Sequence, residues 1–234
     1  MALDYDSFVS RVAALAVIDE ADVRYVAILP SAIDYAEQRI YRDLNLLTTT
    51  VRTTGSSLTA NSRNFTLPSG DGRFVVLTGI NLLSSGVRIA QLSPVSLEFI
   101  DATYPAETAT ASSVVPEYFA MVTDQSIAVA PAPGSAWDVE VIGEIRPVAL
   151  SDAQTTTYLT NYLPDLFLAA AMVFISGWQR NFGAQSDDPK MAMSWEAQYQ
   201  TLLASSSIEE HRKRWQSVSW TSKALSPVAL PQRG

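Results

Sequence analysis

The feature that most constrains the fold is a long apolar run, Leu163 to Trp178, with the sequence LPDLFLAAAMVFISGW. Pro164 suits the first turn of a helix, because the N–H that proline lacks would have no partner there. Asp165 then places a negative charge at the favourable end of the helix dipole. A helix that is apolar on nearly all sides is buried in protein or in lipid. Because the run is shorter than the roughly 20 residues that a bilayer requires, it predicts a central helix covered by other parts of the chain.

The composition excludes several classes of protein. The 234 residues suffice for one large domain or for one domain with an insertion. With no cysteine and a single histidine, His211, the chain has no disulfide framework, no thiolate metal site and no two-histidine metal site of its own. The net charge of −8 argues against a free nucleic-acid-binding protein, because phosphate contacts depend on Lys and Arg. The acidic start MALDYDSF lacks the basic region of a signal peptide, and we expect no membrane partner.

Helical patterns occupy both ends of the chain. Residues 4–18 and 22–44 place apolar side chains at helical spacing, and Pro30 predicts a kink or a break in the second stretch. Residues 190–215 predict one long amphipathic helix, and its short connection to the apolar run predicts an antiparallel helical hairpin. Three side chains of the second stretch are interpreted as packing at the rim of an amphipathic helix: Tyr35, Arg39 and Tyr41.

The middle of the chain, residues 48–150, has the composition of β structure. Thr, Ser, Gly and β-branched residues replace helix formers, and apolar and polar residues alternate between turn signals. Within this region, Ser93 and Pro94 predict the start of a short helix as its N-cap and first residue. The stretch Ala132 to Ser135 predicts a hairpin turn, and the polar stretch 105–115 predicts a surface loop.

Together these patterns predict an α+β fold. We expect a helical bundle from residues 1–47 and 151–215, an inserted antiparallel β-domain at 48–150, and an extended C-terminal arm at 216–234. Residues 205–234 contain five Lys or Arg and two Glu, which gives +3 there and −11 for the remainder of the −8 chain. A basic segment with apolar residues on an acidic body predicts an arm that binds another protein surface, and the alternative is a disordered tail.

No group of residues selects a chemical reaction. The pairs Asp187-Asp188 and Glu209-Glu210 are adjacent in sequence, and adjacent side chains on a helix point in different directions. His211 lies in the charged stretch EEHRKR, and the chain has no serine motif of the GxSxG type to accompany it. We therefore expect no enzyme, no catalytic or metal-binding residue and no cofactor.

The order of several motifs resembles that of the head-to-tail adaptor proteins of tailed bacteriophages. Those proteins have a P-D-L-L-x-x-A helix entry, a later W-x-x-x-Y-x-x-L helix, and a P-x-Y-Y-A … I-x-L-x-P-x-P strand pair. The matching positions here are Pro164, Asp165, Leu166, Ala169, Trp195, Tyr199 and Leu202 in the closing helices, and Pro116, Tyr118, Phe119, Ala120, Ile127, Val129, Pro131 and Pro133 in the strand pair. The resemblance covers most of the chain.

The resemblance implies a structural virion protein at the head-to-tail junction, made in the host cytoplasm during assembly. Such proteins form a ring, commonly a dodecamer, below the portal protein. The ring extends the channel for genomic DNA and provides a platform for tail or nozzle proteins. An acidic body suits this role, because a negative channel wall would not trap passing DNA. The loops 54–62 and 105–115 are the expected tail contacts. Alternatives are another neck or tail-tube protein and a virion-associated cell-wall hydrolase.

The resemblance also assigns two sets of residues. The arm that docks on the portal is expected to use Arg212, Arg214, Trp215, Trp220, Lys223, Leu225, Val228 and Leu230. The core of the closing helices is expected to contain Leu166, Ala169, Phe174, Trp178, Trp195, Tyr199 and Leu202.

Overall fold

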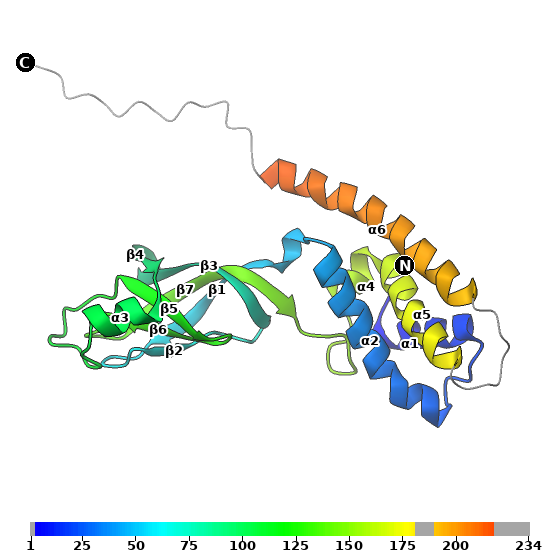
Figure 1. The fold of residues 1–234 in the computed structure, drawn as a ribbon, viewed down its shortest axis with the longest axis horizontal. Helices are drawn as coiled ribbons and strands as arrows, with labels where there is room; N and C mark the ends of the chain where they lie inside the picture. The colour runs from blue at the N-terminus through cyan, green and yellow to red at the C-terminus, as the bar shows by residue number, and fades with distance from the viewer. Residues whose placement is uncertain (1–2, 181–189, 218–234) are drawn as a thin grey trace, which may run out of the picture. The chain divides into compact units, whose positions relative to one another are not determined.

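A computed structural model describes residues 3–180 and 190–217, and it has the α+β fold that the sequence predicts (Figure 1). The chain divides into two compact units. The helical unit contains Phe8–Leu47 together with the described residues from Leu159 onward, and the β unit contains Leu3–Ser7 and Thr48–Tyr158.

Outside the β region, the described residues form five α-helices: α1 (Tyr5–Ala16), α2 (Val23–Asp43), α4 (Tyr158–Tyr162), α5 (Pro164–Arg180) and α6 (Lys190–Ser217). Helix α2 begins after Asp22, whose side chain accepts hydrogen bonds from the backbone N–H groups of Arg24 and Tyr25. Pro30 lies inside α2 and does not split it. The helix continues because the face formed by Leu29, Ala32 and Ile33 is buried, which offsets the one hydrogen bond that proline cannot donate.

The apolar run forms α5, which packs against both α2 and α6. Ala169, Ala170 and Ala171 are at most 1% exposed, so their small side chains allow the neighbouring helices to approach closely. The rings of Phe8 on α1 and Phe167 on α5 are also fully buried and stack with their centroids 4.4 Å apart. This aromatic pair therefore connects the two ends of the chain inside one core.

The β unit is built on one seven-stranded sheet. Its strands are β1 (Thr50–Leu58), β2 (Asn64–Thr66), β3 (Gly72–Ser84), β4 (Val87–Pro94), β5 (Tyr118–Thr123), β6 (Ser126–Ala130) and β7 (Trp137–Pro147), in the order β1-β7-β3-β4-β5-β6-β2. A 3-10 turn, η1 (Leu47–Thr49), precedes β1, and a short helix, α3 (Leu97–Thr103), follows β4. All neighbouring strands pair antiparallel except β4 and β5, which pair in parallel through Ser93–Tyr118 and Pro94–Phe119.

All seven strands contribute to one apolar core. Its buried side chains are Leu58, Phe65, Leu67, Phe74, Ile80, Leu82, Leu92, Phe119, Ile127, Val129, Val139, Val141 and Ile145. Because one cluster includes side chains from both edge strands, β1 and β2, the sheet curls around its own apolar face.

Two local predictions in the β region are wrong. Ser93 and Pro94 end strand β4 and do not begin a helix, because the N–H of Ser93 donates to the carbonyl of Glu117 in the sheet. Helix α3 starts three residues later, where the hydroxyl of Ser96 accepts a hydrogen bond from the N–H of Phe99. The stretch 132–135 is not a hairpin turn, because the strands it connects, β6 and β7, are not neighbours in the sheet.

Candidate functional site

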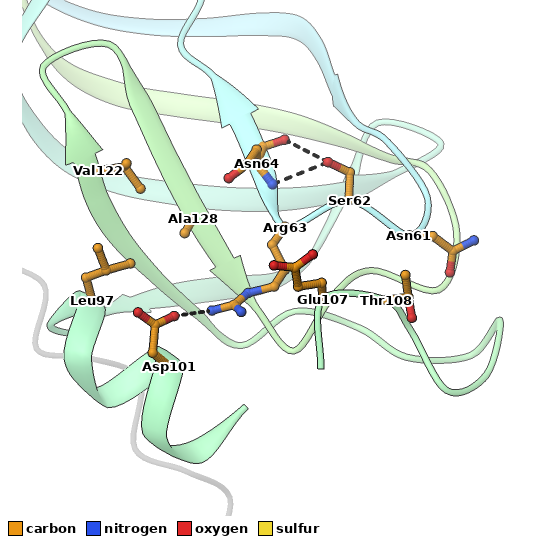
Figure 2. Close-up of a pocket in the computed structure, with 10 residues that line it drawn as sticks. All are labelled: Asn61, Ser62, Arg63, Asn64, Leu97, Asp101, Glu107, Thr108, Val122 and Ala128. Carbon is orange, nitrogen blue, oxygen red and sulfur yellow. Dashed lines mark hydrogen bonds and ion pairs between the residues drawn. The ribbon is translucent and has the colours of Figure 1, made fainter. Parts of the chain in front are cut away.

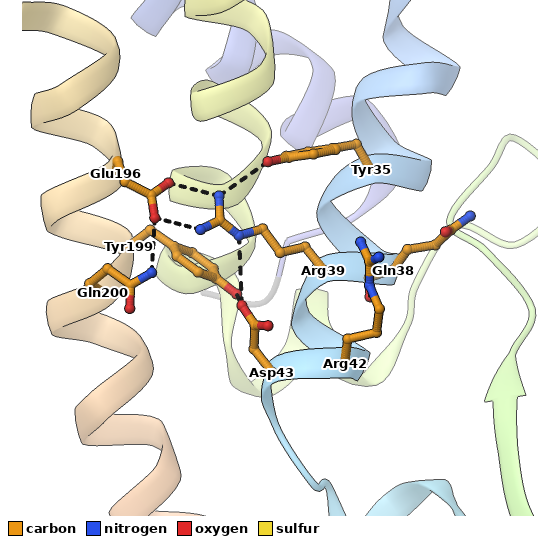
Figure 3. Close-up of polar contacts among 8 residues, drawn as sticks. All are labelled: Tyr35, Gln38, Arg39, Arg42, Asp43, Glu196, Tyr199 and Gln200. Carbon is orange, nitrogen blue, oxygen red and sulfur yellow. Dashed lines mark hydrogen bonds and ion pairs between the residues drawn. The ribbon is translucent and has the colours of Figure 1, made fainter.

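A polar cluster fastens α6 to α2 in the helical unit (Figure 3). The guanidinium of Arg39 on α2 donates two hydrogen bonds to the carboxylate of Glu196 on α6, at 2.8 and 2.5 Å. Its central carbon also lies 4.1 Å from the centre of the Tyr199 ring. The Tyr199 hydroxyl in turn donates to Asp43 at 2.7 Å. We refer to these residues, together with Tyr35 and Gln200, as the Arg39 cluster.

The charges of the Arg39 cluster satisfy one another. The hydrogen bonds from Arg39 lower the pKa of Glu196, so this carboxylate is ionised at neutral pH. Burial of Tyr199, followed by its hydrogen bond to Asp43, raises the pKa of the phenol, which therefore stays protonated. A paired arginine, an ionised carboxylate and a protonated phenol provide a rigid attachment between two helices rather than an acid–base pair for catalysis.

A second attachment holds the C-terminal half of α6. The buried carboxylate of Glu210 accepts a hydrogen bond from the backbone N–H of Leu47 at 3.0 Å, and Lys213 donates to the same carboxylate at 2.7 Å. Arg214 donates to the side chain of Asn45. Helix α6 is therefore attached to α2 and to the segment that follows α2, almost to its end at Ser217.

The structure describes only part of the predicted portal-binding arm. Arg212, Arg214 and Trp215 belong to α6, where Arg212 is exposed, Arg214 is half-buried and Trp215 is 75% exposed. The other five predicted positions lie outside the described residues: Trp220, Lys223, Leu225, Val228 and Leu230. The described part of the predicted arm therefore lies in the last two turns of helix α6.

The residues expected in the core of the closing helices differ in burial. Leu166, Ala169 and Tyr199 are at most 1% exposed. The other four, Phe174, Trp178, Trp195 and Leu202, are half-buried. Phe174 packs against Tyr35 of α2 with a ring separation of 5.3 Å.

A pocket of about 360 Å³ lies in the β unit (Figure 2). Its lining residues are Asn61, Ser62, Arg63, Asn64, Leu97, Asp101, Glu107, Thr108, Val122 and Ala128. Arg63 donates to Asp101 of α3 at 3.0 Å, and its side chain is only 13% exposed. Within the described chain, the buried Nε of Arg63 has no hydrogen-bond partner. The pocket therefore offers polar groups for contact with another molecule.

Two loops that are expected tail contacts both contribute residues to this pocket. The first loop is shorter than 54–62, because β1 continues to Leu58, and it contributes Asn61 and Ser62. The second, 105–115, contributes Glu107 and Thr108. Backbone hydrogen bonds from Asn61 to Pro133 and from Gly134 to Val114 connect both loops to the segment before β7.

Sequence reasoning missed the role of Arg39, which it interpreted as rim packing. A signal was present in the pattern of α6, because Glu196 and Tyr199 are three residues apart and therefore lie on one helix face. Nothing in the sequence connects that pair to Arg39, which is 157 residues from Glu196.

Other candidate chemistry finds no support in the described chain. His211 is exposed on α6, and Asp187 and Asp188 lie outside the described residues. Across residues 3–180 and 190–217, no group of three or more His, Asp and Glu side chains is placed to hold a metal ion. None of the helices in the described ranges has both the length and the apolar character needed to cross a membrane.

Comparison with known families gives a clear assignment. The model of the SU10 adaptor protein family matches residues 3–224, which is nearly the whole chain. The chain belongs to the SU10 adaptor protein family. This is a family of structural head-to-tail adaptors of phages, so the resemblance found in the sequence motifs is confirmed. A search among curated proteins finds no match for the chain.

Proposed function

We propose that this SU10-family adaptor forms a ring below the portal of a tailed phage, extends the DNA channel and provides the platform on which the tail assembles. The family match over residues 3–224 carries the proposal. An adaptor must contact at least two other virion proteins, and the chain offers different surfaces on its two units. A dodecameric ring at the head-to-tail junction, through which genomic DNA passes without sequence-specific contacts, suits the acidic net charge of −8.

The portal contact is assigned to the segment that follows α6. Residues 218–234 contain Lys223 and Arg233 and no acidic residue, and they alternate polar residues with Trp220, Leu225, Val228 and Leu230. Apolar anchors supply most of the contact energy in protein interfaces, and charges set register and partner choice. The hydrogen bonds of Glu210 and Arg214 support this assignment, because they hold the end of α6, the helix that this segment follows.

The tail contact is assigned to the pocket of the β unit. Its rim combines Asn61, Ser62, Glu107 and Thr108 from two loops, and polar loops on a rigid sheet are a common basis for recognition. We expect substitutions at this rim to leave portal binding intact and to block tail attachment.

Mass photometry with purified portal protein from the same phage tests the portal assignment. The full chain should form a large closed complex with the portal, and a variant that lacks residues 218–234 should lose that complex while keeping its circular dichroism spectrum. Val87→Glu, at an exposed position on β4, is the matched control and should bind as the wild type does. Unchanged portal binding by the truncated variant would contradict the arm assignment, and a wild-type chain that ignores the portal would contradict the proposed function.

A further inference from the structure

An apolar stripe on α2 faces solvent. Val23, Val26, Ala27 and Pro30 are all exposed, with Val23 at 81%, and they follow the i, i+3, i+4, i+7 spacing of one helix face. The opposite face of the same two turns is buried through Tyr25 and Leu29, so α2 has two apolar faces, and the described residues of the unit bury only one of them. Soluble proteins rarely expose such stripes unless another molecule covers them.

The turn before this stripe is acidic and contains a strained residue. Asp19, Glu20 and Asp22 outnumber Arg24 by two charges. Val17, at the end of α1, has a φ of 55° and is 79% exposed. A β-branched residue in this conformation is strained, and such strain clusters at sites of function. We call the exposed residues of α2, with these three carboxylates, the acidic stripe.

The end of α6 carries a stripe of matching spacing and opposite charge. Ile208, His211, Arg212 and Trp215 are exposed at i, i+3, i+4 and i+7, with Ile208 at 55%. Lys213 forms ion pairs with both Glu209 and Glu210, at 2.8 and 2.7 Å. Among the described residues, Arg212 has no ion-pair partner, so its charge is available to another molecule. We call these four residues the basic stripe.

The two stripes of one copy cannot meet each other. The basic stripe follows the points at which α6 is attached near the C-terminal end of α2, namely Tyr199 to Asp43, Glu210 to Leu47 and Arg214 to Asn45. The acidic stripe ends at Pro30, 13 residues before Asp43. At 1.5 Å per residue, Pro30 lies about 20 Å and Val23 about 30 Å along α2 from Asp43.

We propose that the basic stripe of one copy docks on the acidic stripe of a second copy of this chain. Two helix faces with the same spacing pack through their apolar residues, while Arg212 meets the carboxylates around Asp19 and Glu20. Because the two stripes are different surfaces at opposite ends of α2, the contact is head-to-tail and generates a closed ring or a filament. The inference rests on the proposed ring and identifies its two faces.

Cross-linking between engineered thiols tests this contact in the intact protein. The chain has no cysteine, so Val26→Cys and Ile208→Cys introduce the only thiols. The two variants are given different affinity tags, mixed, assembled with purified portal protein and treated with a short bis-maleimide. We expect a heterodimeric cross-link between Val26→Cys and Ile208→Cys. The pair Val26→Cys and Val87→Cys, which replaces the basic stripe with an exposed valine of the β unit, should yield none.

Charged substitutions supply a second readout. Val26→Glu places an unpaired carboxylate in the apolar part of the acidic stripe, and Arg212→Glu reverses the charge of the basic stripe. Each alone should weaken the contact between copies about tenfold or more. A mixture of the two variants retains one intact pair of faces, so it should form a one-to-one dimer and stop there. Wild-type assembly by either variant, or a mixture that stays monomeric, would overturn the proposal.

The outcomes separate this inference from the proposed function. A portal complex of wild-type mass without the Val26–Ile208 cross-link would overturn the assignment of the two faces and leave the adaptor function standing. A cross-link from Ile208→Cys to the portal itself would show that the basic stripe serves the portal instead. If the wild-type chain neither binds the portal nor associates with itself, both proposals fail.

Discussion

The two units are assembled from the chain in different ways. The helical unit joins residues 8–47 to the described residues from 159 onward, whereas the β unit consists mostly of the continuous segment Thr48–Tyr158. In the helical unit, side chains connect distant segments, as Phe8 does with Phe167 and Arg39 with Glu196. In the β unit, backbone hydrogen bonds between neighbouring strands connect the chain.

This difference indicates where each unit is vulnerable. Many backbone hydrogen bonds hold the strands of a sheet together, and no single side-chain substitution removes them. A helical unit built from two ends of a chain depends on the side chains between the helices, because each helix satisfies its own backbone. We therefore expect side-chain truncation to disturb the helical unit more, and backbone crowding to disturb the β unit more.

The largest expected effect comes from the aromatic pair of the helical unit. Phe167→Ala removes a fully buried ring that stacks on Phe8 and should lower the free energy of unfolding by about 3–5 kcal/mol. Urea unfolding followed by far-ultraviolet circular dichroism should show an early loss of helical signal, while the β unit unfolds at its wild-type urea concentration.

Phe99→Ala provides the matched control, because Phe99 is an exposed phenylalanine on α3 of the β unit. Its effect should be much smaller. If both units of the Phe167→Ala variant unfold together, their stabilities are coupled and the comparison between them fails.

Backbone crowding in the β unit should have the next largest effect. A Cβ atom at Gly134 would lie 2.1 Å from the carbonyl oxygen of Ala111, so Gly134→Ala must displace the loop 105–115. We expect a loss of about 1–3 kcal/mol and faster amide hydrogen exchange in this loop. Gly70→Ala is the control, because a Cβ there has no atom within 4 Å. Wild-type exchange in the Gly134→Ala variant would show that the loop is not held by this contact.

Local patterns in the sequence predicted the helices well and the sheet less completely. The continuous apolar run predicts α5 because a helix that is apolar on nearly all sides must be covered by other parts of the chain. Ser93 and Pro94 were misread because their serine–proline signature is local, whereas the partner that holds Ser93 in the sheet, Glu117, is distant in sequence. The parallel pairing of β4 with β5 is likewise a non-local feature that no turn signal reveals.

The candidate sites show the same limit. Composition alone predicted that the end of the chain is basic on an acidic body, and the exposed Arg212 and Trp215 lie in that region. The exposed stripe on α2 was not predictable, because Val23 and Val26 have the same apolar character as the buried Leu29 of the same helix. Only the packing of the helices determines which of two apolar faces is covered.

We expect the smallest effect from the pH dependence of the ion pair between Arg39 and Glu196. Arg39 lowers the pKa of Glu196, so this ion pair contributes stability above the ordinary pKa of glutamate and loses it as pH falls through the lowered pKa of the folded state. Because the Glu196 side chain is 38% exposed, solvent limits the contribution to about 0.5–1 kcal/mol. The free energy of unfolding of Glu196→Gln should therefore fall below that of the wild type at pH 7, and the two should converge in acid.

Glu98→Gln, on α3 of the β unit, is the matched control for this titration. Glu98 is exposed and, within the described chain, has no ion-pair partner, so the substitution should leave the wild-type profile unchanged. Urea unfolding at a series of pH values measures both variants. If the difference between wild type and Glu196→Gln stays constant as pH falls, the effect of the substitution comes from packing and not from the charge of Glu196. In that case the helical unit would depend on side-chain shape between α2 and α6, and the ion pair would add nothing to its stability.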